Sequence, residues 1–70
     1  MPYVNLKMYP GRTDEQKREV ARRIAEVVGE VCNVPDLSQT VVVVEEVSRE
    51  DWPTQVKPEC EAKSAHQFHP

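Results

Sequence analysis

A run of four valines, at positions 41–44, is the feature that most constrains the fold of this chain. The four β-branched residues do not alternate with polar ones, and such a run is typical of a strand that is covered on both faces. We therefore expect a strand over Thr40 to Val47, within a sheet whose two faces are both buried. A chain of 70 residues has few segments with which to provide that cover.

A second strand is expected near the beginning of the chain. Residues 3–9 alternate between apolar and polar side chains, with Val4, Leu6 and Met8 on one side, and this period of two is that of a half-buried strand. The pair Pro10-Gly11 favours a turn that ends the strand.

The residues between the two strands predict one amphipathic helix. Thr13 stands three residues before Gln16, which is the spacing of a capping box at a helix start. Apolar residues then recur at helical spacing: Val20, Ile24, Val27, Val28 and Val31. An asparagine and a proline end the helix near Cys32, which we expect to be a small core residue at the end of this apolar stripe.

A strand, a helix of about nineteen residues and a second strand make a right-handed β-α-β unit with parallel strands, so the predicted fold class is α/β. One helix covers only one face of a two-stranded sheet. The other face and the unpaired strand edges therefore predict a homo-oligomer, in which a second copy covers them. Self-association also suits a small domain, which alone buries only about 60% of the surface that its unfolded chain exposes.

The chain divides into a core over 2–52 and a C-terminal extension over 53–70. The extension contains prolines and many polar residues, and we expect only a turn around Trp52 and a short helix near Glu59 to Ser64. Its last residues are expected to be disordered unless a neighbouring subunit holds them. Three candidate metal ligands, Cys60, His66 and His69, do not complete a four-ligand set, so we predict a solvated tail and no metal site.

Composition excludes several functional classes. The net charge is -3, and acidic residues lie among the basic ones of the helix, which indicates a solvated helix face and no nucleic-acid partner. No apolar run is long enough for a membrane span, and no secretory leader is visible. Only two cysteines are present, which favours free thiols and a reduced, cytoplasmic setting.

The proline at position 2 suggests a catalytic role. A methionine that precedes a small residue such as proline tends to be removed, and Pro2 then carries a free secondary amine. The ordinary pKa of an α-amino group is roughly 7.7 to 8.0, and an apolar pocket or a nearby cation lowers it. We therefore expect Pro2 to act as a general base near neutral pH.

A base that removes a proton beside a carbonyl leaves an enolate, which needs a cation. Arg12 lies just past the first strand, and its planar guanidinium can pair two oxygens of a carboxylate or stabilise the oxyanion. Tyr9 and Trp52 are candidate apolar walls that exclude water from the amine.

The first seventeen residues, "MPYVNLKMYPGRTDEQK", resemble the 4-oxalocrotonate tautomerase family. The resemblance implies a cofactor-independent tautomerase that acts on an unsaturated 2-oxo or 2-hydroxy acid, with Pro2 as catalytic base and Arg12 as the first substrate-binding arginine. The family's aromatic pocket residue falls on Trp52, and the second arginine of its best-known member falls on Val41. The resemblance also implies an active site between subunits, in a hexamer built as a trimer of dimers or in a dimer.

Two alternatives remain open. On the same fold, a protonated Pro2 can serve a hydratase, dehalogenase or decarboxylase, for which Glu45, Glu46 and Asp51 are candidates to activate water. A chain that keeps Met1 has an amide at Pro2 instead of an amine, and it would be a non-catalytic oligomerising subunit.

Overall fold

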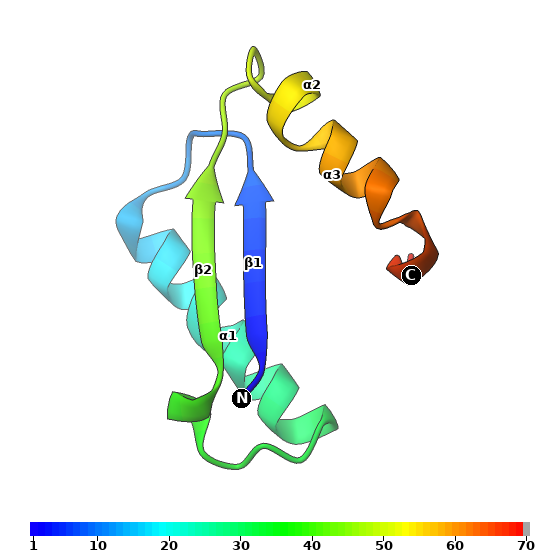
Figure 1. Ribbon diagram of the computed structural model, residues 1–70. Coiled ribbons are helices and arrows are strands. Elements are labelled where there is room, and N and C mark those ends of the chain that lie inside the picture. Colours follow the sequence, from blue (N-terminus) through cyan, green and yellow to red (C-terminus); the bar gives the residue numbers. More distant parts are fainter. Residues whose placement is uncertain (70) are drawn as a thin grey trace.

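The computed structural model of this protein describes residues 1–69. Two parallel strands lie side by side, and the longest helix crosses one face of the sheet (Figure 1). Short helices near the C-terminus lead away from the end of the sheet at which both strands finish (Figure 1). The elements follow in this order: β1 (Tyr3–Met8), α1 (Asp14–Val31), the 3-10 helix η1 (Leu37–Gln39), β2 (Val41–Glu46), α2 (Trp52–Gln55), α3 (Lys57–Ala62) and the 3-10 helix η2 (Ser64–His66). The predicted α/β class and the β-α-β unit are confirmed.

The register of the sheet places the start of β1 beside the valine run. Tyr3 pairs with Val41 at one end, and Met8 pairs with Glu46 at the other. Because side chains alternate along a strand, Val42, Val44 and Glu46 share one face. That face meets α1, since Glu46 contacts a lysine of this helix.

The opposite face of the sheet has no helix across it (Figure 1). Tyr3 and Val41 lie there as an adjacent pair, and their exposed fractions are 67% and 42%. The expectation that both faces of the valine strand are covered is thus met on one side only within a single chain. That a second copy covers this bare face stays a prediction.

Helix α1 begins as the sequence predicts. The Thr13 hydroxyl accepts a hydrogen bond from the Gln16 N–H, and the Gln16 side chain accepts one from the Thr13 N–H, which completes the capping box. The apolar stripe is buried around Ala25, which is 9% exposed.

The last turns of α1 differ from the prediction. Val27 and Val31 are 57% and 73% exposed, and Cys32 is exposed, so the expectation of a buried Cys32 is wrong. A helix of 18 residues is about 27 Å long, whereas six-residue strands span about 20 Å. The end of α1 therefore extends past the sheet.

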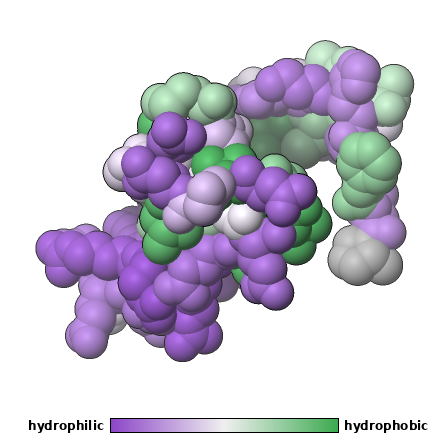
Figure 2. Space-filling model, turned by 90° about the horizontal axis from the view of Figure 1, so that it is seen from below, coloured by the Kyte–Doolittle hydropathy of each residue, from purple (hydrophilic) through white to green (hydrophobic). Residues whose placement is uncertain are grey.

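The C-terminal segment is more ordered than its composition suggests. The expected short helix is present as α3, and a further helical turn, α2, precedes it. Val56, which joins them, is 5% exposed, and Glu59 accepts a hydrogen bond of 2.7 Å from Lys7 of β1. The segment then arches away from the body (Figure 2). Pro70, part of the tail expected to be disordered, lies outside the described residues.

Candidate active site

Pro2 lies directly before β1 and is half-buried. Its carbonyl accepts a hydrogen bond of 3.0 Å from the Val41 N–H, which is the first bond of the parallel pairing. Met1, by contrast, is 88% exposed. A proline fits here because only its carbonyl takes part in the sheet, so its nitrogen needs no hydrogen.

The other three predicted site residues gather at the opposite end of β1. The rings of Tyr9 and Trp52 meet edge to face, with centroids 4.7 Å apart and an interplanar angle of 64°. Arg12 is exposed, and its guanidinium donates a hydrogen bond of 3.1 Å to the Tyr9 carbonyl. The structure thus brings these three residues together at one end of β1. Their role in an active site stays a prediction.

A carboxylate fixes the turn that carries Arg12. Gly11 has a φ of 127°, which glycine adopts at little cost, and its N–H donates a 2.9 Å hydrogen bond to Glu46. Lys17 of α1 also pairs with Glu46. The hydrogen bond from Lys17, followed by that from Gly11, lowers the pKa of Glu46 below its ordinary value. The turn is thereby tied to both α1 and β2.

Pro2 and Arg12 do not meet within one chain. Tyr9 is seven residue steps along the chain from Pro2, and at the rise of a strand this is about 23 Å. Figure 1 shows the N-terminus at one end of β1 and the turn that follows the strand at the other. A site that uses both residues therefore needs a second copy of the chain.

Trp52 is positioned by the turn that precedes α2. Its N–H donates a 2.9 Å hydrogen bond to the Ser48 carbonyl, and the Ser48 hydroxyl accepts one of 3.1 Å from the Asp51 N–H. The ring also borders a cavity of about 430 Å³ between β1 and α3.

Arg49 belongs to the same cluster and was missed by the sequence reasoning. Its guanidinium carbon lies 4.4 Å from the centroid of the Tyr9 ring, in the geometry of a cation–π contact. The one sequence feature that relates Arg49 to this cluster is its position three residues before Trp52. The contact joins a loop to a strand end forty residues earlier, so local patterns do not reveal it.

The remaining candidates lie away from Pro2. Glu45 accepts a hydrogen bond of 2.8 Å from Asn5, and the register places both Glu45 and Glu46 at the far end of the sheet. Asp51 precedes Trp52. Val41 is the residue next to Pro2, so the position of the family's second arginine brings no charge there.

The cysteine and histidines of the tail are exposed, and Cys60 and His66 line the cavity beside α3. Among residues 1–69, no three His, Cys, Asp or Glu side chains are grouped so as to hold a metal ion. Within the same residues, none of the helices has the length and apolar character that crossing a bilayer requires.

The fold and this cluster define a small α/β subunit with a cationic and aromatic surface at one strand end and a proline at the other. Comparison with known families gives a match over residues 2–58 to the family described as tautomerase enzyme. The chain belongs to the tautomerase family, and it is an enzyme of the isomerase class.

Curated relatives agree with this assignment. A probable tautomerase of Bacillus cereus is 40% identical over 52 residues, which cover 74% of this chain and 84% of the relative. A 2-hydroxymuconate tautomerase of Bacillus subtilis is also 40% identical over 52 residues, covering 74% of this chain and 82% of the relative. A shorter match, 46% identical over 35 residues, is to a probable tautomerase of Streptococcus thermophilus and covers 50% of this chain and 57% of the relative. No solved structure matches.

Proposed function

We propose that the protein is a homo-oligomeric tautomerase that moves a proton on an unsaturated 2-oxo or 2-hydroxy acid, without a cofactor. The free nitrogen of Pro2 is the general base. Arg12 of a second copy binds the substrate carboxylate or the developing oxyanion, and the Tyr9 and Trp52 rings beside it exclude water.

The proton transfer follows from these groups. The Pro2 nitrogen takes the hydroxyl proton of the dienol, and the electron pair of the broken O–H bond is delocalised as a dienolate. The Arg12 guanidinium stabilises this anion through charge-assisted hydrogen bonds. The protonated Pro2 then returns the proton to a carbon of the conjugated chain, which forms the unsaturated 2-oxo acid and restores the base.

The observation that carries this proposal is that Pro2 and the Arg12 cluster lie at opposite ends of β1 in one chain, which the rise of a strand places about 23 Å apart. It is complemented by the bare sheet face, where Tyr3 and Val41 are exposed beside Pro2. An assembly that covers this face and brings the opposite strand end of a neighbour to Pro2 satisfies both features. We expect a dimer, or a hexamer built as a trimer of dimers, and sedimentation distinguishes them.

The state of the N-terminus supports a base at Pro2. Met1 is 88% exposed, so a peptidase can reach it. Its removal leaves the hydrogen bond between Pro2 and Val41 intact, because that bond uses the carbonyl. Intact mass of protein from its native source tests this step, and a retained Met1 would favour the non-catalytic subunit.

The assay substrates follow from the proposed chemistry. We suggest 2-hydroxymuconate, which appears in the name of the Bacillus subtilis relative, and phenylenolpyruvate, which has a single carboxylate. Protein lacking Met1 is compared with Pro2→Ala and Arg12→Ala on both substrates. Both variants are expected to lose most of the activity, and equal activity of Pro2→Ala and the unchanged protein contradicts the role of Pro2.

A mixing experiment tests whether the site is shared. The two inactive variants, Pro2→Ala and Arg12→Ala, are unfolded and refolded together in equal amounts. If each site takes its proline and its arginine from different copies, random pairing leaves about a quarter of the sites with both intact. Activity is then recovered in the mixture. No recovery, with each variant shown to assemble normally, refutes a shared site.

A further inference from the structure

Two guanidinium groups contact Tyr9, one at its backbone carbonyl and one at its ring. Arg12 donates a hydrogen bond to its carbonyl, and Arg49 lies over its ring at 4.4 Å. Over residues 1–69, neither of these arginines forms an ion pair with a carboxylate. Two cations that lack carboxylate partners among the described residues thus contact Tyr9, although the chain as a whole is acidic, with a net charge of -3.

The contact of Arg49 with Tyr9 leaves its hydrogen-bond donors available. A guanidinium that lies over an aromatic ring is attracted through its face, and the N–H groups point outward in the plane of the group. These donors match the two oxygens of a carboxylate. The contact with the ring also restricts the Arg49 side chain, so less conformational entropy is lost when an anion binds.

Nearby carboxylates do not neutralise Arg49. Glu46 is occupied by Lys17 and by the Gly11 N–H. Glu50 and Asp51 follow Arg49 in the chain, and both are exposed. In the described part of the chain, neither pairs with it. The anion that completes this pair of arginines is therefore expected from a ligand.

We propose that Arg49 is a specificity residue of the active site that recognises a second negative charge on the substrate, while Arg12 binds the first. This inference rests on the proposed function, because it places the substrate at the Tyr9 end of the neighbouring copy. Arg49 supplies a positive charge that Val41, the residue beside Pro2, lacks. The site then prefers a dicarboxylate over a monocarboxylate of the same length.

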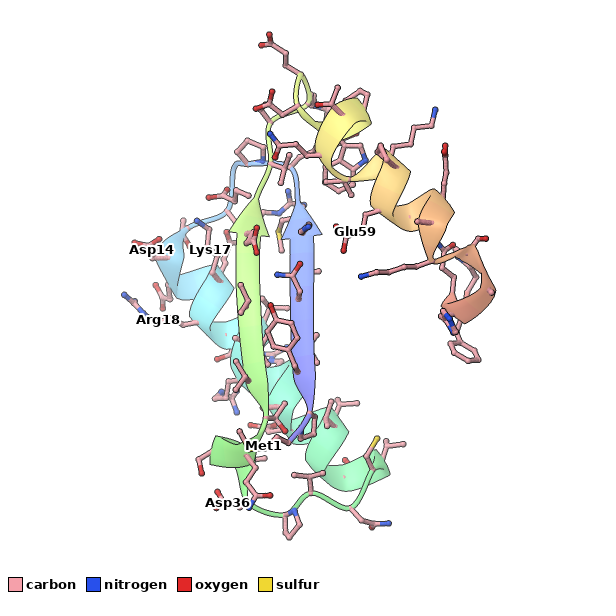
Figure 3. The ribbon with its side chains drawn as sticks, viewed as in Figure 1. Met1, Asp14, Lys17, Arg18, Asp36 and Glu59 are labelled. Carbon is pink, nitrogen blue, oxygen red and sulfur yellow. The ribbon has the colours of Figure 1, made fainter. Side chains whose placement is uncertain are left out.

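Binding of two inert ligands tests the proposal without depending on turnover. Muconate and sorbate have the same six-carbon chain with two conjugated double bonds. Muconate has a carboxylate at each end, whereas sorbate has a methyl group in place of one carboxylate. Their association constants are measured by calorimetry on the assembled protein lacking Met1, for the unchanged protein, Arg49→Gln and Arg49→Lys. Arg18→Gln is the matched control, because Arg18 is exposed on α1 and points away from the sheet (Figure 3).

The ratio of the muconate to the sorbate association constant is the decisive quantity. We expect Arg49→Gln to lower this ratio about tenfold, since one charge-assisted hydrogen-bonded contact is lost. Arg49→Lys should retain part of the preference, and Arg18→Gln should leave the ratio unchanged. An unchanged ratio in Arg49→Gln overturns the proposal, and so does an equal loss in Arg18→Gln, which would indicate a general charge effect.

The outcome is separable from that of the proposed function. Loss of the role of Pro2 appears in the turnover of Pro2→Ala, whereas the role of Arg49 appears in the binding ratio. Circular dichroism and sedimentation of each variant show that it is folded and assembled. If Arg49→Gln does not assemble, Arg49→Met decides the matter, because it removes the charge and keeps an apolar side chain against Tyr9: a ratio equal to that of the unchanged protein refutes recognition of the second carboxylate by Arg49.

Discussion

Gly29 of α1 provides a stability test whose sign depends on the tertiary structure. In an exposed helix, replacing glycine with alanine stabilises by about 1 kcal/mol. Here a Cβ atom at Gly29 would lie 2.7 Å from the Val34 carbonyl oxygen and 3.2 Å from a methyl carbon of Leu37. The backbone oxygen cannot move easily, because the Val34 N–H donates a 3.0 Å hydrogen bond to the Gly29 carbonyl.

The gain in helix propensity and the close contact change the free energy of unfolding in opposite directions, and the contact has the larger effect. Overpacking typically costs about 1 to 3 kcal/mol, so Gly29→Ala is expected to reduce the free energy of unfolding by about 1 kcal/mol after the helix gain is subtracted. For a domain of this size, that corresponds to a decrease in Tm of about 4 to 8 °C.

The measurement is thermal unfolding at one fixed protomer concentration, because an oligomer's Tm depends on concentration. Glu30→Ala is the control: Glu30 is exposed on the same helix, and its replacement should change stability by less than about 0.5 kcal/mol. A higher Tm for Gly29→Ala would refute the close approach of Val34 to this helix.

Two further predictions concern the start of α1 and the turn that carries Arg12. Thr13→Ala removes one half of the capping box and should destabilise the protein by about 1 kcal/mol in urea unfolding, whereas Thr13→Ser should retain most of the stability. The pKa of Glu46 is lowered from 4.5 by Lys17, so its contribution to stability is complete above pH 4.5 and is lost as the pH falls through the lower, folded value. Accordingly, Tm should fall more steeply between pH 5 and pH 3 in the unchanged protein than in Glu46→Gln, and parallel curves would contradict this.

The sequence predicted the parts of the fold that depend on local patterns. The alternation of residues 3–9, the Thr13 and Gln16 spacing and the valine run each correspond to an observed element. The exposure of the last turns of α1 was not predictable in this way, because helical periodicity does not reveal how far the sheet extends. Cys32 falls on the expected stripe but lies beyond the strands it was meant to contact.

The candidate site shows the same division. Arg12 and Trp52 were candidates from the family resemblance and Tyr9 from its place at the strand end, and the structure brings the three together. Their role in a site stays a prediction. Arg49 could not be found from spacing, since its contact with Tyr9 depends on the conformation of the loop after β2. The separation of Pro2 from this cluster was predictable, because the strand expected over residues 3–9 lies between them.

The position of Pro2 and Arg12 at opposite ends of β1 also has a genetic consequence. On the shared-site proposal, every copy serves as the proline donor of one site and the arginine donor of another. A copy that lacks both groups therefore inactivates two sites, so the fraction of inactive sites is larger than the fraction of damaged copies. When damaged and intact alleles are expressed together, the remaining fraction of activity should be smaller than the fraction of intact copies. Such mutations are then expected to be dominant.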